Sequence, residues 1–289
     1  MSSAKINFLG FPNHDVYNIT APFLWMGRNI IAGRVEKRTE ELSQIIFFEN
    51  TDNGCWTPIK NGPNFSGLQD PCVTRINGKI LLGGVRFPVT VGQERNAWQM
   101  EFFLANEDGK FEKILTGPPK MKDIRFLQFP DHRILVLTRP QGERGGRGKI
   151  GFCLVNKLEE ATHDLIDEAP LFDHCPEESW VGANEAHFLK NGKIGVLGHI
   201  AQFCTNRDRH YFSMVFSIDP EKGTSSKLII IAKRCDFPKG DSKRNDLEDV
   251  IFSGGMHRLK DGKARLFVGL SDAEAGFLDL PDPFLQYES

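Results

Sequence analysis

The sequence has 289 residues, and its 36 lysines and arginines nearly balance its 38 aspartates and glutamates, giving a net charge of -2. This balance provides no general field that would attract nucleic acid or an anionic membrane. The N-terminal stretch lacks a basic start followed by an apolar segment, and no apolar run approaches the roughly 18 residues that cross a membrane. We therefore expect a soluble, cytoplasmic protein with neither nucleic acid nor a membrane as a partner.

The cysteines are widely scattered and form neither a CxxC pair nor a spacing typical of metal ligands. We therefore expect no metal site and no other cofactor. Reduced and mostly buried thiols fit such scattered cysteines in a cytosolic protein. The six positions are Cys55, Cys72, Cys153, Cys175, Cys204 and Cys235.

Short β-rich runs joined by tight turns recur along the chain in five groups. In chain order the groups cover residues 24–48, 73–104, 124–154, 186–231 and 249–278. Units of roughly 50 residues are typical of radial repetition, so the sequence predicts an all-β, five-bladed β-propeller. A two-sheet sandwich or jelly roll is the competing architecture. No linker divides the chain, and we expect a single domain over residues 1–289.

The clearest hairpin lies in the second group. Two β-rich runs, 73–76 and 79–85, flank the turn Asn77-Gly78, which is the strongest short-range hairpin signal. Asp70 precedes the first run, so we expect it on the loop that leads into this strand. Helical periodicity is weak throughout, and residues 156–167 are either one helix or a charged loop.

In a propeller the loops that enter the inner strands converge on the central channel, and polar residues at those places must be considered together. The first unit offers Asn18, Arg34 and Glu36, the second Asp70 and Arg86, the third Lys122, Asp123, Arg125 and Arg139, the fourth Asn184, Glu185, His187 and His199, and the fifth Asp249 and Asp272.

Each of these residues has a functional and an ordinary interpretation. Desolvation in a channel raises the pKa of a carboxylate, which would suit Asp70 as a general acid, whereas an Asp-Pro pair commonly caps a turn. Arg34 and Arg139 follow strands at matching places and could clamp a phosphate, although surface ion pairs are commoner. His199 is a phosphate donor or a core histidine.

The segment GERGGRGK, residues 142–149, is rich in glycine and cations but lies between two predicted strands instead of opening a helix. It therefore matches neither the P-loop nor the dinucleotide-binding fingerprint. It is either a cationic loop at the channel rim or a plain hairpin turn.

The ordered motifs NITAPF, AGRVE, GLQDPCVTRINGK, FPDHRILVLTRP, GKIGVLGH, DVIFSGG and VGLSDAEAG resemble the β-mannoside phosphorylases of glycoside hydrolase family 130. They resemble still more the mannosyltransferase/phosphorylases of glycosyltransferase family 108. The resemblance extends from about residue 14 to residue 279. It implies a five-bladed propeller of the glycoside hydrolase family 43/130 type that acts on β-mannosides.

The resemblance also implies roles for residues. Asp70 matches the single catalytic acid, Arg34 and Arg139 match arginines that face phosphate, and His199 matches a histidine near phosphate. Asp272 is similar to an acid that holds sugar hydroxyls. Two positions depart from the pattern, because Gln69 replaces a glutamate and Cys72 replaces an arginine.

We extend these roles to the other residues at the channel. Arg125 joins the predicted phosphate site, and the predicted sugar contacts are Asn18, Glu36, Arg86, Asn184, Glu185, Asp249 and Asp272.

Hydrolysis with inversion needs two carboxylates, one of which activates water. One acid facing several cations suits phosphorolysis instead, because inorganic phosphate is already an anionic nucleophile. The sequence therefore predicts an inverting β-1,2-mannoside phosphorylase or mannosyltransferase that interconverts manno-oligosaccharide plus phosphate with mannose 1-phosphate, with GDP-mannose as a second type of donor. A propeller glycoside hydrolase and a non-catalytic carbohydrate-binding propeller are the alternatives, and oligomerisation is open.

Overall fold

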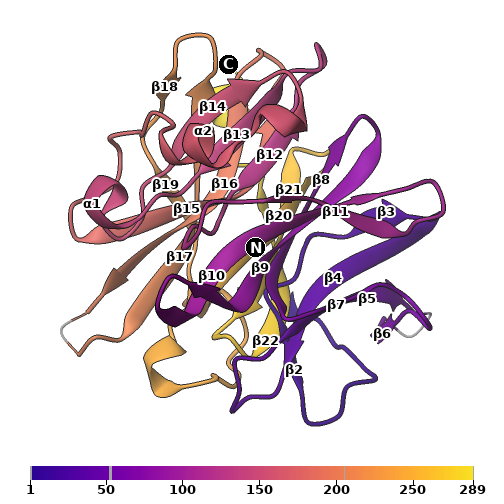
Figure 1. Ribbon diagram of the computed structural model, residues 1–289. Helices are drawn as coiled ribbons and strands as arrows, with labels where there is room; N and C mark the ends of the chain where they lie inside the picture. The colour runs from indigo at the N-terminus through magenta and orange to yellow at the C-terminus, as the bar shows by residue number, and fades with distance from the viewer. Residues whose placement is uncertain (1, 52–53, 205, 289) are drawn as a thin grey trace.

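The computed structural model describes residues 2–51, 54–204 and 206–288, and the strands in these ranges form five antiparallel sheets (Figure 1). The sheets follow one another along the chain, with β-strands paired mostly to their sequence neighbours. Their arrangement is a five-bladed β-propeller, as predicted, and the sandwich alternative is wrong.

The first two blades occupy the N-terminal part of the chain. The first contains β2 (Asp15–Tyr17), β4 (Arg28–Glu36), β5 (Gln44–Asn50) and β6 (Trp56–Pro58), with β3 (Phe23–Trp25) and β7 (Asn64–Ser66) paired to β4 and β5. The second contains β8 (Leu68–Ile76), β9 (Lys79–Val91), β10 (Glu94–Ala105) and β11 (Phe111–Thr116).

The third blade is the smallest, with β12 (Arg125–Gln128), β13 (Ile134–Thr138) and β14 (Gly151–Val155). The fourth contains β15 (Ser179–Phe188), β16 (Ile194–Phe203), β17 (Arg209–Asp219), β18 (Thr224–Ser225) and β19 (Ile229–Ala232). The fifth contains β20 (Ile251–Arg258), β21 (Lys263–Leu270) and β22 (Glu274–Pro281).

The first and last strands of the described chain pair with each other. The N-terminal strand β1 (Ser2–Lys5) pairs with β22, so the first strand of the sequence is the outer strand of the last blade. This pairing covers an edge of the fifth sheet and ties the two ends of the described chain together. The five predicted groups of strands did not include it.

The helical segments are short. They are α1 (Gly142–Gly145), η1 (Leu158–Glu160), α2 (His163–Asp167), η2 (Arg234–Asp236), η3 (Asn245–Leu247) and η4 (Leu285–Tyr287). The segment 156–167 therefore contains two short helical turns instead of one helix. Within the described ranges, no helix is both long and apolar enough to cross a membrane.

The predicted hairpin is present, but Asp70 lies elsewhere than expected. Asn77 and Gly78 have φ of 51° and 77° and join β8 to β9, with Ile76 paired to Lys79. The prediction that Asp70 precedes the strand is wrong, because Asp70 lies inside β8. The pairing register shifts between Gln69 and Cys72, so Asp70 and the following proline form a bulge in the strand.

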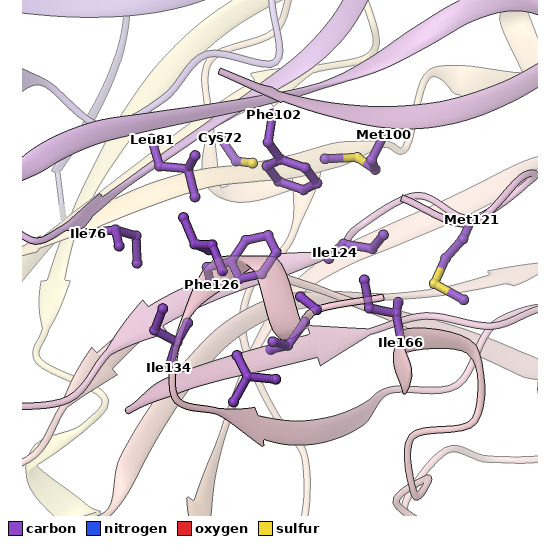
Figure 2. Close-up of a cluster of buried hydrophobic side chains, with 14 of the residues drawn as sticks. Cys72, Ile76, Leu81, Met100, Phe102, Met121, Ile124, Phe126, Ile134 and Ile166 are labelled. Atoms are coloured by element: carbon purple, nitrogen blue, oxygen red, sulfur yellow. The ribbon is translucent and has the colours of Figure 1, made fainter. Parts of the chain in front are cut away.

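Apolar clusters fill the spaces between neighbouring blades. Figure 2 shows one of them, in which Cys72, Leu81 and Phe102 of the second blade face Phe126 and Ile134 of the third. Comparable clusters join the other neighbouring pairs. The blades are therefore held to one another by side-chain packing, which leaves the polar ends of the inner strands around a common axis.

The cysteines are less buried than the sequence predicts. All six are free thiols, and Cys72 is buried, whereas Cys235 is exposed and the others are partly exposed.

Candidate active site

A polar cavity of about 210 Å³ lies where the five blades meet. Its lining residues are Asn18, Arg34, Glu41, Gln69, Asp70, Lys122, Asp123, Arg139, His199, Arg209, Tyr211, Arg244, Leu247, Val250, Phe252 and Asp272. The structure thus brings together Asn18, Arg34, Asp70, Arg139, His199 and Asp272 of the residues selected from the sequence.

Four of the lining residues share an uncommon backbone conformation. Asn18, Asp70, Asp123 and Asp272 come from four different blades, and their φ values lie between 43° and 62°. Asparagine and aspartate tolerate this left-handed region better than most residues. Backbone strain of this kind gathers at functional sites, and here it turns four short polar side chains toward one cavity.

Asp70 is held by two donors from the first blade. The side-chain amide of Asn18 donates to Asp70 Oδ1 over 2.7 Å, and Arg34 Nη1 donates to the same oxygen over 3.1 Å. Burial alone would raise the pKa of Asp70, but the charges of Arg34 and Lys122 and these hydrogen bonds outweigh it, so the pKa is lowered. This is opposite to the shift expected from the sequence.

Arg34 is fixed by a buried network behind the cavity. Glu36 Oε2 accepts a hydrogen bond from Arg34 Nη2 over 2.8 Å, and Ser43 Oγ accepts one from Arg34 Nε over 3.0 Å. Glu36 also accepts from Tyr17 and Lys243. Glu36 is only 1% exposed and does not line the cavity, so its contact is with Arg34 instead of with a ligand.

Asp272 differs from Asp70 in its protonation. Burial raises the pKa of Asp272 to about 6, and the charge of Asp70 adds to the rise, while Arg34 and Lys243 oppose it. Of these two carboxyls, Asp70 therefore favours the ionised form, whereas Asp272 titrates just below neutral pH.

A second cluster of charges surrounds Asp123 at another part of the cavity. Arg139 Nε lies 3.4 Å from Asp123 Oδ2, and the two remaining members, Arg125 Nη2 and His199 Nε2, lie 3.7 and 3.8 Å from its oxygens. Burial opposes ionisation of Asp123, but the surrounding cations lower its pKa.

The donors of this cluster are not all used. Arg139 is 2% exposed, and its Nη1 has no hydrogen-bond partner among the described residues. Lys122 also lines the cavity and forms no ion pair in the described part of the chain. A buried donor without an acceptor is costly, and an anion in the cavity would satisfy it.

His199 is neutral in this environment. Burial lowers its pKa to about 3 against the opposing charge of Asp123. Its Nδ1 lies 2.9 Å from Asn184 Oδ1, so the hydrogen bond to this oxygen assigns the ring proton to Nδ1. The ring also stacks on Tyr211, with 5.6 Å between centroids, which fixes its orientation at the cavity wall.

The remaining residues selected from the sequence lie outside this cavity. Arg86 donates to Glu101 over 2.7 Å, Glu185 accepts from the amide of Met256, and Asp249 lies 2.5 Å from His210 Nδ1. Arg125 and Asn184 line a separate cavity of about 170 Å³ together with Glu185. Arg125 contacts the charge cluster through Asp123, and its Nε donates to the carbonyl of Asn184 over 2.8 Å.

Several lining residues were missed by the sequence analysis. The sequence analysis assigns no role to Lys122 and Asp123, although they directly precede the strand predicted to begin at residue 124. Arg209 and Tyr211 lie at the start of β17, and Arg244 lies on the long connection before β20. No local motif marks these three, because tertiary structure alone brings their segments to the cavity.

The geometry separates two chemical functions in one cavity. Asp70 presents a carboxylate that residues of the first blade hold in place, and Arg139 and Lys122 present donors for an anion to the same cavity. Such an arrangement suits group transfer between a hydroxyl and an anionic leaving group.

Solved structures with the same fold were found in comparisons with known proteins. MPT-4, a mannose phosphorylase from Leishmania mexicana solved with a phosphate ion, is 32% identical with a TM-score of 0.90, over 100% of this chain and 91% of that one. MPT-1, a GDP-Man-dependent mannosyltransferase from the same organism, is 28% identical with a TM-score of 0.89, over 100% and 92%.

A more distant structure shares the fold alone. The β-1,2-mannobiose phosphorylase from Listeria innocua is 12% identical with a TM-score of 0.67, over 97% of this chain and 94% of that one. A search of curated proteins gives no match. The family model described as protein of unknown function, DUF1861, matches residues 1–286. The chain therefore belongs to the DUF1861 family, and its resemblance to mannosyltransferase/phosphorylases is confirmed.

Proposed function

We propose that this protein is an enzyme that transfers a mannosyl group between an anionic leaving group and a sugar hydroxyl, as an inverting mannoside phosphorylase or mannosyltransferase. The acceptors are β-1,2-linked manno-oligosaccharides, and mannose 1-phosphate is the product of phosphorolysis. GDP-mannose is a second donor of the same chemical type. We further propose that the described blades act as one domain and use no metal.

One observation carries this proposal. Asp70 lines the same cavity as Arg139 and Lys122, and among the described residues Arg139 Nη1 has no hydrogen-bond partner and Lys122 has no ion-pair partner. In phosphorolysis the cations position phosphate for attack at the anomeric carbon, while Asp70 gives a proton to the departing hydroxyl oxygen. In the synthetic direction Asp70 accepts the proton of the attacking hydroxyl, and the cations stabilise the leaving phosphate.

The low pKa of Asp70 fits such a two-way role. Arg34 and Lys122 favour the ionised carboxylate, which is the form that accepts a proton. A phosphate bound beside Lys122 and Arg139 offsets part of this positive field, so the pKa of Asp70 rises when the site is filled. Phosphorolysis, which requires the protonated acid, thus becomes favourable only with phosphate in place.

Hydrolysis is the strongest alternative, because Asp272 supplies a carboxyl at the cavity that titrates near neutral pH. A hydrolase needs a base that activates water, and an ionised Asp272 would meet that need above pH 6. However, a hydrolase has no use for the unpaired donors of Arg139 and Lys122. These donors favour an anionic reactant over water.

The proposed function is tested by incubating the protein with mannose 1-phosphate and a β-mannoside acceptor and measuring released phosphate. Phosphate release with elongation of the acceptor is the expected result. In the reverse assay, a β-1,2-manno-oligosaccharide with inorganic phosphate gives mannose 1-phosphate. Release of free mannose at the same rate with and without phosphate would instead establish a hydrolase. Binding of mannosides without turnover would establish a non-catalytic protein.

A further inference from the structure

The cationic segment 142–149 lies beside the part of the cavity that carries Arg139, Lys122 and Asp123, here called the anion end, and Arg147 in this segment has no charged partner among the described residues. Arg147 is exposed on the connection between β13 and β14. In the ranges that the structure describes, its guanidinium forms neither an ion pair nor a hydrogen bond. Its contacts are with two rings, because the guanidinium carbon lies 4.9 Å from the centroid of Phe203 and 5.8 Å from that of Trp180.

The two rings form a fixed support. Trp180 and Phe203 have centroids 4.9 Å apart, and Trp180 Nε1 donates to the hydroxyl of Tyr211 over 3.1 Å. Tyr211 in turn stacks on His199. A continuous series of ring contacts therefore connects Arg147 to the donors around Asp123.

Backbone contacts place Arg147 at the same end. Arg139 Nη2 donates to the carbonyl of Arg147 over 3.3 Å, so the segment that carries Arg147 also holds the buried arginine. Arg209 lines the cavity, pairs with Asp246 and lies 5.7 Å over Phe203. The contacts of Asp70, by contrast, run to Asn18 and Arg34 of the first blade.

We propose that Arg147, supported by Trp180 and Phe203, stacks on the base of a nucleoside diphosphate whose terminal phosphate occupies the donors around Arg139. This inference rests on the proposed function, and it assigns a rim subsite to the leaving group of a sugar-nucleotide donor. Guanidinium groups stack on aromatic rings through one face and on nucleobases through the other. Arg147 has this arrangement, with its ring contacts made and its side chain exposed.

A sugar acceptor fits this surface less well. Sugars stack their C–H faces on bare aromatic rings, but Phe203 is covered by both Arg147 and Arg209. The acceptor also has to meet Asp70, whose contacts lie in the first blade. A nucleobase is flat and can stack on the guanidinium of Arg147, and the phosphates joined to it carry the negative charge that the donors around Arg139 attract.

The transfer step balances without another reactant. The acceptor oxygen forms a bond to the anomeric carbon as the bond from that carbon to the phosphate oxygen breaks. The nucleoside diphosphate leaves with the electron pair, and the acceptor proton passes to Asp70.

Calorimetric titration with GDP, pyrophosphate and inorganic phosphate separates the base from its phosphates. We expect GDP to bind roughly tenfold more tightly than pyrophosphate, because a stacked base adds to the contacts that both share. Arg147→Lys keeps the charge but removes the plane, so it weakens GDP roughly tenfold and changes pyrophosphate less than twofold.

Arg144→Ala is the matched control, since Arg144 is in the same segment but donates to the carbonyls of Glu168 and Ala169. It is expected to leave the ratio of GDP to pyrophosphate affinity unchanged. Equal affinities for GDP and pyrophosphate, or unchanged GDP binding in Arg147→Lys, would overturn the rim subsite. The proposed function is decided separately by phosphate release from mannose 1-phosphate, which does not involve a base.

Discussion

Arg34 links Asp70 to Glu36, with Nη1 at 3.1 Å from Asp70 Oδ1 and Nη2 at 2.8 Å from Glu36 Oε2. Glu36 is buried and is itself bound by Tyr17, Ser43 and Lys243. The buried residues around Glu36 therefore fix the guanidinium of Arg34. Through Arg34 they also fix the position of Asp70, the proposed proton carrier.

The first prediction concerns Asp70. Asp70→Asn keeps the size of the side chain but removes its ability to exchange a proton, so kcat for phosphorolysis should fall by roughly 10³-fold. Binding of phosphate, measured by calorimetry, should stay within a few fold of the original because Arg139 and Lys122 are untouched. A variant that keeps more than a tenth of the original kcat would contradict the assignment.

The second prediction separates stability from phosphate binding at Arg139. Arg139→Ala leaves Asp123 buried with Arg125, at 3.7 Å, as its remaining ion-pair partner in the described ranges, which should lower the free energy of unfolding by about 3 kcal/mol. The KM for phosphate should rise at least tenfold.

The matched control for Arg139→Ala is the double variant with Asp123→Asn. Removing the stranded charge should restore part of the stability, as measured by urea unfolding, while the KM for phosphate stays high. If the double variant recovered phosphate affinity as well, Arg139 would act only as a partner of Asp123.

Much of the fold could be predicted from local signals. The Asn77-Gly78 turn and the recurring β-rich runs are sufficient for the hairpins and for the number of blades. The bulge at Asp70 could not be predicted, because it depends on which residue of β9 pairs with each residue of β8. The pairing of β1 with β22 joins opposite ends of the chain and has no local signal.

Site residues on the inner strands that face the propeller axis could be predicted from the sequence. Contacts and pKa shifts that depend on charged residues far away in the sequence could not. Arg34 and Glu36 were both selected, but alternate positions of a strand lie on one face, and the two therefore pair with each other. Lys243 reaches Glu36 from 207 residues away. The low pKa of Asp70 depends on Arg34 and Lys122 together, and burial of Asp70 alone predicts the opposite shift.

The third prediction uses the opposite pKa shifts of Asp272 and Asp70. The folded protein raises the pKa of Asp272 from 3.8 to about 6, so protonated Asp272 stabilises the fold. This stabilisation is present below the unfolded pKa, decreases as pH rises toward 6, and is absent above it. Asp272→Asn should therefore raise the free energy of unfolding at pH 7.5 by about 1–2 kcal/mol and change it little at pH 4. Asparagine tolerates the φ of 51° at this position.

Asp70→Asn is the control of opposite sign for this pH dependence. The pKa of Asp70 is lowered in the folded state, so its contribution to stability is present above the unfolded pKa and is lost as pH falls. This variant should be less stable than the original at pH 7.5. Chemical unfolding at the two pH values measures both effects, and a destabilised Asp272→Asn at pH 7.5 would show that its carboxylate is favoured by the fold.

The fourth prediction concerns Gly269 on β21, which is not among the residues that line the cavity but lies against Asn18. A Cβ added at Gly269 would lie 2.0 Å from Asn18 Oδ1 and 2.6 Å from Asn18 N, so Asn18 has to move. Its hydrogen bond to Asp70 is then lost, and Gly269→Ala should lower kcat roughly tenfold as well as the melting temperature. The control is Gly276→Ala on the neighbouring strand, where the added Cβ would lie 2.8 Å from the carbonyl of Ala4, away from the cavity. This control should lower the melting temperature but leave kcat unchanged, and equal losses of kcat in both variants would mean that the effect is one of general stability.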